Sequence, residues 1–303
     1  MLPGRSPRRF AAALATAAAT ALAGCAVAPG APALPAAKAA PPDERAVAYG
    51  PDAAQVLDVY RPPPTGAALA RGTLVYVHGG SFVGGWREAV TLTNPELLGV
   101  LRLGWGVVSI DYRLLPAAGG ITAEVGDVRR AIEWARAHGP AHGLDPSTIV
   151  VVGHSAGGTL AELSAAAPAG PGRPDAWVAV SGVADIGAWA TANHATVPTP
   201  EPLAAVSPLT ASAVPSVPGY VIHAEADPFL PVAQARALVD RYRGAGDTVT
   251  FDEVTVTPTC HPHSATCGMD MRAFAQWLSR VGTTAPAVPP GLGHGIVAMV
   301  AGQ

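Results

Sequence analysis

The feature that most constrains the fold is a series of short, almost continuous apolar runs separated by longer helical patterns. Strands that show this pattern are buried on both faces, as in a parallel sheet covered by helices on each side. The sequence therefore predicts one doubly wound α/β domain with a mostly parallel central sheet and helices on both faces. The expected strands are residues 73–77, 106–111, 148–153, 177–181, 219–224 and 248–254.

Other parts of the chain add to this alternation or interrupt it. Segments 46–49 and 55–60 predict antiparallel strands at the start of the sheet. Residues 123–138 predict the best-defined helix, because apolar side chains recur there at three- and four-residue spacing and form one buried stripe. Residues 183–215 interrupt the alternation, and we expect either a small cap over a site or a long surface excursion.

The first 25 residues combine positive charge, a short apolar run and a cysteine. Three arginines precede a short apolar run over residues 10–23, which is too short to span a bilayer. The run ends in Leu-Ala-Gly-Cys, which resembles a lipobox, and an ordinary secretory signal with a chance cysteine is the alternative. We expect residues 1–24 to be a removed signal peptide and Cys25 to carry lipid. The protein would then be anchored to the membrane in the cell envelope, facing outside the cytoplasm.

Composition divides the rest of the chain into three parts. Residues 25–42 are rich in proline and alanine and hold few large apolar groups, so they predict a tether and not a folded unit. Residues 43–281 carry the expected strands and helices and form the single domain, and residues 282–303 begin as a Pro/Gly-rich tail. The formal net charge of −3 offers no basic surface, so nucleic acid is not an expected partner.

Residues 153–157, Gly-His-Ser-Ala-Gly, fit the pattern G-x-S-x-G between an expected strand and an Ala-rich helix. A serine at such a turn sits in a strained backbone conformation that lifts its hydroxyl above the sheet edge. Its neighbours two residues away must lack side chains, or the strand and helix could not approach each other. A chance turn of small residues is the alternative. In this context we interpret Ser155 as a nucleophile.

Residues 78–82, His-Gly-Gly-Ser-Phe, directly follow another expected strand. The glycines leave the peptide N–H groups of Gly80 and Ser81 free to face a bound carbonyl oxygen. Together with the N–H of Ala156 they would form an oxyanion hole. A plain glycine turn is the alternative. We interpret His78 as a structural brace of this loop and not as a base.

A matching acid and base are expected after later strands. Asp227 follows the fifth parallel strand and is the favoured acid, with Glu225 as the local rival. His261 and His263 are both candidates for the base, because both lie between the last strand and the final helix. His261 is preferred, since it falls five residues after Val256, which is a plausible loop reach. The order Ser, Asp, His differs from the two protease orders.

Cys260 and Cys267 remain once Cys25 is assigned to lipid. In an exported protein the setting is oxidising, so we expect these two cysteines to form a disulfide. Two free thiols or a metal pair are the alternatives. No second Cys/His pair with suitable spacing is present, so no metal site is expected. A bridge here would stiffen the loop that carries both candidate histidines.

Taken together, these motifs resemble those of the α/β-hydrolases, nearest to the hormone-sensitive-lipase-like and kynurenine-formamidase-like esterases. The matching pieces occur in the family's order and cover roughly residues 70–281. They are HGGSF at 78–82, DYRL at 111–114, Asp127 on a helix that carries AIEW, GLDPSTIVVVGHSAGG at 143–158, SPL at 207–209 and EADPFLP at 225–231.

The resemblance implies a carboxylesterase that cleaves a small-molecule ester through an acyl-enzyme and needs no cofactor. It implies a triad of Ser155, Asp227 and His261, with His263 as the alternative base, and oxyanion donors at Gly80, Ser81 and Ala156. The chain departs from the family in two places, since Ser81 replaces a third glycine and a cysteine pair surrounds the candidate base. Three alternatives stay open: an arylformamidase or other small-amide hydrolase, a peptidase, and a non-catalytic binding lipoprotein of the same fold.

Overall fold

The computed structural model describes residues 41–63, 71–256 and 261–282 of the 303-residue chain. The expected signal peptide over residues 1–24, the lipidation site Cys25 and the expected disulfide partner Cys260 lie outside these residues, as do nearly all of the tether and the tail. Among the described residues, no helix combines the length and the apolar character needed to cross a bilayer.

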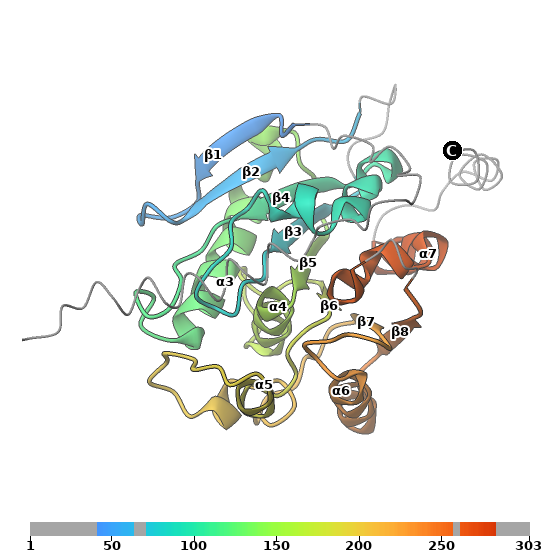
Figure 1. The fold of residues 1–303 in the computed structure, drawn as a ribbon. Helices are drawn as coiled ribbons and strands as arrows, with labels where there is room; N and C mark the ends of the chain where they lie inside the picture. The colour runs from blue at the N-terminus through green and yellow to red at the C-terminus, as the bar shows by residue number, and fades with distance from the viewer. Residues whose placement is uncertain (1–40, 64–70, 257–260, 283–303) are drawn as a thin grey trace, which may run out of the picture. The chain divides into compact units, whose positions relative to one another are not determined.

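An eight-stranded sheet forms the centre of the fold, with the strand order β1-β2-β4-β3-β5-β6-β7-β8 (Figure 1). Strand β2 pairs antiparallel with both of its neighbours, and every other pairing is parallel. The expected antiparallel start and mostly parallel sheet are therefore confirmed. The strands are β1 (Glu44–Ala48), β2 (Val56–Tyr60), β3 (Thr73–Val77), β4 (Gly106–Ile110), β5 (Ile149–His154), β6 (Ala176–Val180), β7 (Gly219–Ala224) and β8 (Val249–Val254).

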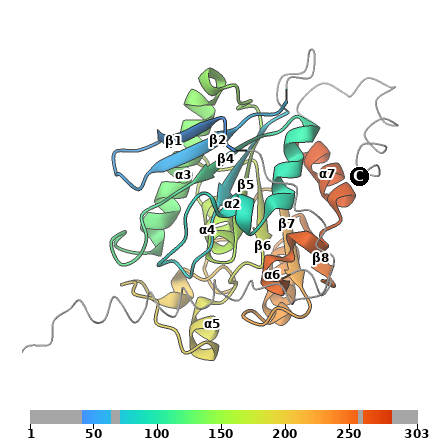
Figure 2. The same ribbon diagram turned by 45° about the horizontal axis from the view of Figure 1, so that its top comes forward.

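Helices cover both faces of this sheet (Figures 1 and 2). One face packs against α3, α4 and α6, and the other packs against α2, η1 and α7. The α-helices are α2 (Ala89–Leu92), α3 (Ile121–His138), α4 (Ala156–Ala166), α5 (Ile186–Ala192), α6 (Val232–Gly244) and α7 (Met271–Val281). The 3-10 helices are η1 (Pro95–Leu103), η2 (Gly139–His142), η3 (Leu203–Ala205) and η4 (Pro262–Gly268).

Strand β3 shows why the apolar runs are continuous. Val75 and Val77 belong to the core on one face of the sheet, and Leu74 and Tyr76 belong to the core on the other. Successive side chains of a strand point to opposite faces, so a strand covered on both sides needs apolar residues at every position. Full burial of one such large side chain contributes about 1.5–3 kcal/mol.

The segment 183–215 forms α5 and η3 (yellow in Figure 1). Asp185 caps the start of α5, because its side chain accepts a hydrogen bond from the N–H of Ala188. Ile186 and Val206 are buried in the same core as α4 and α6. The interruption of the alternation is thus explained by a short helical excursion that is anchored to the main core at both of its ends.

Candidate active site

The turn at Ser155 joins the end of β5 to the start of α4. Ser155 has φ 54° and ψ −122°, a conformation that a residue with a side chain rarely adopts. A Cβ atom on Gly153 would collide with the carbonyl oxygen of Gly157, and a Cβ on Gly157 would collide with that of Val77. Gly153 is therefore needed for β5 and α4 to approach each other, as the sequence motif predicts, and Gly157 is needed for α4 to approach β3.

His263 lies between the predicted nucleophile and the predicted acid. Its Nδ1 is 2.8 Å from Oδ2 of Asp227, and its Nε2 is 3.0 Å from Oγ of Ser155. A carboxylate only accepts hydrogen bonds, so Nδ1 carries the proton and Nε2 accepts from the serine hydroxyl. The ring thereby joins the three side chains in the arrangement of a Ser-His-Asp triad.

The preference for His261 over His263 is wrong. His261 is the N-cap residue of η4, and its Nδ1 accepts a hydrogen bond from the N–H of His263 at 3.3 Å. Its ring lies against Phe229, with ring centroids 6.1 Å apart. The imidazole two residues later is the one that reaches Ser155, because the turn into η4 directs it there.

Asp227 is the acid that meets the imidazole, as the sequence favoured. Its Oδ1 accepts from the N–H groups of Phe229 at 2.9 Å and Leu230 at 3.0 Å. Burial acts to raise the pKa of Asp227, but the hydrogen bonds from His263 and Phe229 outweigh it, so the pKa falls below its usual value. The rival Glu225 instead accepts from the hydroxyl of Thr255 at 3.2 Å.

The glycine loop after β3 packs directly against the nucleophile turn. A Cβ on Gly79 would lie 2.9 Å from the Cβ of Ser155, and the three residues after Gly79 all have positive φ. Among the described residues, the N–H groups of Gly80, Ser81 and Ala156 donate to no protein oxygen. Three backbone donors thus remain available beside the serine, as an oxyanion hole requires.

Known proteins share this sequence pattern. Residues 122–281 match the model of the prolyl oligopeptidase family, and residues 57–170 match the BD-FAE model. Esterase LipC of Mycobacterium tuberculosis (strain ATCC 25618 / H37Rv) is 33% identical over 279 residues, which cover 78% of this chain and 68% of LipC. The chain belongs to the α/β-hydrolase superfamily. Esterase LipQ of the same organism is 32% identical over 241 residues, which cover 71% of this chain and 56% of LipQ.

The alignments leave part of each relative unmatched, since this α/β-hydrolase chain spans about half to two thirds of the length of these curated relatives.

Among solved structures, Esterase B from Lactobacillus rhamnosis has a TM-score of 0.65 at 20% identity, covering 90% of this chain and 96% of that chain. The esterase Est2 of Thermogutta terrifontis has a TM-score of 0.62 at 20% identity, covering 83% and 97%. At such identities the likeness supports the α/β-hydrolase fold alone.

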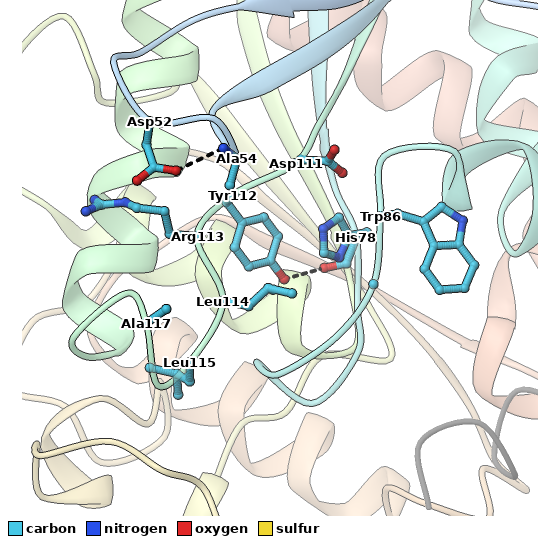
Figure 3. Close-up of a pocket in the computed structure, with 11 residues that line it drawn as sticks. Asp52, Ala54, His78, Trp86, Asp111, Tyr112, Arg113, Leu114, Leu115 and Ala117 are labelled. Carbon is cyan, nitrogen blue, oxygen red and sulfur yellow. Dashed lines mark hydrogen bonds between the residues drawn. The ribbon is translucent and has the colours of Figure 1, made fainter. Parts of the chain in front are cut away.

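His78 braces the glycine loop of this α/β-hydrolase, as the sequence suggested. Its Nδ1 donates to the carbonyl oxygen of Gly79 at 2.8 Å, and its ring stacks on Tyr112 with centroids 4.4 Å apart. The hydroxyl of Tyr112 donates to the carbonyl oxygen of His78 at 2.9 Å (Figure 3). Burial lowers the pKa of His78 to about 4, so the ring is neutral at physiological pH.

A cavity of about 450 Å³ lies beside this loop (Figure 3). Its lining includes His78 and Tyr112, but none of the three triad side chains. Trp86 lines the cavity as well, and its indole points away from Tyr112 in this view. The cavity therefore adjoins His78 and Tyr112, which support the glycine loop, and is separate from the three triad side chains.

Cys267 is disulfide-bonded, and its expected partner Cys260 lies outside the described residues, so that pairing stays a prediction. The described part of the chain holds no group of three or more His, Cys, Asp or Glu side chains suited to a metal ion.

Two further buried histidines, His154 and His223, lie close to the triad, although the sequence predicts no role for either. Nε2 of His223 is 2.9 Å from the carbonyl oxygen of Leu230, in the loop after Asp227. Nε2 of His154 is 2.8 Å from the carbonyl oxygen of His263. Both are strand residues close to the triad. Their position at the carboxyl ends of β5 and β7 is the signal that could have drawn attention to them.

Proposed function

We propose that this protein is a serine hydrolase that cleaves a carboxylic ester through an acyl-enzyme on Ser155. The observation that carries the proposal is the His263 ring, which is within hydrogen-bonding distance of both Asp227 and Ser155. Three of its relatives are named as an esterase or a carboxylic ester hydrolase, which supports an ester as the substrate.

In the proposed mechanism, Nε2 of His263 takes the hydroxyl proton while Oγ of Ser155 attacks the substrate carbonyl carbon. The N–H groups of Gly80, Ser81 and Ala156 hold the resulting oxyanion, and each such donor contributes roughly 3 kcal/mol to lowering the barrier. The charged imidazole, steadied by Asp227, then donates its proton to the leaving alcohol. A water molecule, deprotonated by the same ring, releases the acid and restores Ser155.

The reactive serine and the substrate class can be tested together. We expect a fluorophosphonate probe to form an adduct on the peptide that contains Ser155, as located by mass spectrometry. We expect short p-nitrophenyl esters to be hydrolysed faster than N-formylaniline, since a good leaving alcohol demands less of the general acid. Absence of the adduct would contradict a serine hydrolase. Faster cleavage of the formamide would favour the arylformamidase alternative.

We propose, in addition, that residues 1–24 are removed on export and that Cys25 then carries the lipid that holds the domain at the cell envelope. The order of positive, apolar and small residues before Cys25 supports this. In the full chain, Cys25→Ser is expected to move the protein from the membrane pellet to the supernatant after ultracentrifugation. A parent protein found only in the supernatant would refute the anchor.

A further inference from the structure

His154 lies where the nucleophile turn meets the loop that carries the base. It is the last residue of β5, directly before Ser155, and only 7% of its surface is exposed. Its Nε2 is 2.8 Å from the carbonyl oxygen of His263, and the two imidazole centroids are 5.0 Å apart. The buried side chain of His154, next to Ser155 in the sequence, thus contacts the backbone of His263. The ring of His263 in turn contacts Ser155.

The chemistry of the contact fixes the form of the His154 ring. A carbonyl oxygen only accepts, so Nε2 of His154 carries the proton and donates it. Burial lowers the pKa of His154 to about 3, with a further lowering from the nearby His263, so the ring stays neutral wherever a triad imidazole can act as a base. A Cβ on Gly79 would lie 3.2 Å from Nδ1 of the same ring, so His154 also packs beside the oxyanion loop.

The backbone of His263 needs to be held in place because the ring of His263 makes two hydrogen bonds at once. The distances of 2.8 Å to Asp227 and 3.0 Å to Ser155 both depend on where the backbone of His263 lies. Another hydrogen bond to η4 comes from Nδ2 of Asn94, but it reaches Thr266, three residues further on. The hydrogen bond from His154 instead reaches His263 itself, the residue that carries the ring.

We propose that His154 is a positioning residue, whose Nε2–H holds the carbonyl of His263 so that its ring stays aligned between Asp227 and Ser155. This inference rests on the proposed function, since it assigns His263 as the base. His154 touches neither the substrate carbonyl nor the transferred proton in this scheme. It acts by fixing the position of the His263 ring, which takes that proton.

Two substitutions separate the hydrogen bond from the volume of the side chain. His154→Met keeps an unbranched side chain of similar length without a donor, and His154→Gln carries an amide N–H close to where Nε2 lies. We expect His154→Met to lower kcat for a p-nitrophenyl ester by about 10- to 100-fold, with KM within about twofold. His154→Gln is expected to keep kcat within about threefold of the parent. His142→Gln, at a ring that pairs with Glu44, is the control and should match the parent.

A second measurement does not depend on turnover. The N–H that His263 donates to Asp227 should give a downfield proton NMR signal in the parent and in His154→Gln, and this signal should broaden in His154→Met as the ring loosens. Full kcat in His154→Met, or an equal loss in the Met and Gln variants, would overturn the positioning role. A parent that shows the NMR signal but no Ser155-dependent hydrolysis would instead refute the proposed function.

Discussion

Replacement of Ser155 by alanine is expected to lower kcat for a short p-nitrophenyl ester by about 10⁵-fold, because the change removes the attacking oxygen while the oxyanion donors remain. The fold should persist, since alanine and serine meet the same steric limits at φ 54° and ψ −122°. The measurement is kcat by absorbance, together with the thermal unfolding midpoint of both proteins.

Ser147→Ala is a suitable control for this change, because Ser147 is an exposed serine that precedes the same strand β5. It should retain the parent kcat and the parent unfolding midpoint. Hydrolysis by Ser155→Ala at more than about one hundredth of the parent rate would show that another group attacks the ester, and the acyl-enzyme on Ser155 would have to be abandoned.

The second large effect is expected at the base. His263→Ala should lower kcat by at least about 10⁴-fold, because no other ring among the described residues bonds to Oγ of Ser155. His261→Asn should keep kcat within about threefold, since asparagine retains an acceptor for the N–H of His263 at the start of η4. Steady-state kinetics on the two variants, purified in parallel, make the comparison.

The comparison of His261→Asn with His263→Ala identifies which histidine is the base, whatever the absolute rates are. A loss in His261→Asn as large as that in His263→Ala would mean that the turn into η4 matters more than the identity of the base. Full activity in His263→Ala would mean that the hydrogen bond to Ser155 has no part in the reaction.

Local patterns were enough to predict the sheet and the nucleophile turn. The apolar runs identified the strands because burial on both faces demands apolar residues at each position. Gly157 is required by its close approach to Val77 of β3, far away in the sequence, but the G-x-S-x-G pattern itself occupies residues 153–157, between an expected strand and an expected helix. The turn at Ser155 was therefore predictable from the pattern alone. Signals of this kind are contained in a short stretch of chain.

The choice of base could not be made in the same way. His261 and His263 are two residues apart, and counting residues from β8 favoured the nearer one. Which ring faces Ser155 depends on the turn at the start of η4, where His261 serves as the N-cap. The helical path of residues 89–103 was also not predicted, because its buried positions, such as Val90 and Leu97, are determined by packing against α7 and the far face of the sheet.

The strand order has a consequence for how molecules meet one another. Within the described residues the sheet ends at β1 and β8, and each of these strands pairs on one side only. Asp252 and Glu253 lie in the middle of β8, and Arg236 binds the carboxylate of Glu253. Charged side chains along an outermost strand oppose edge-to-edge pairing with a strand of another sheet. We therefore expect the β8 edge to resist pairing with a strand of another molecule.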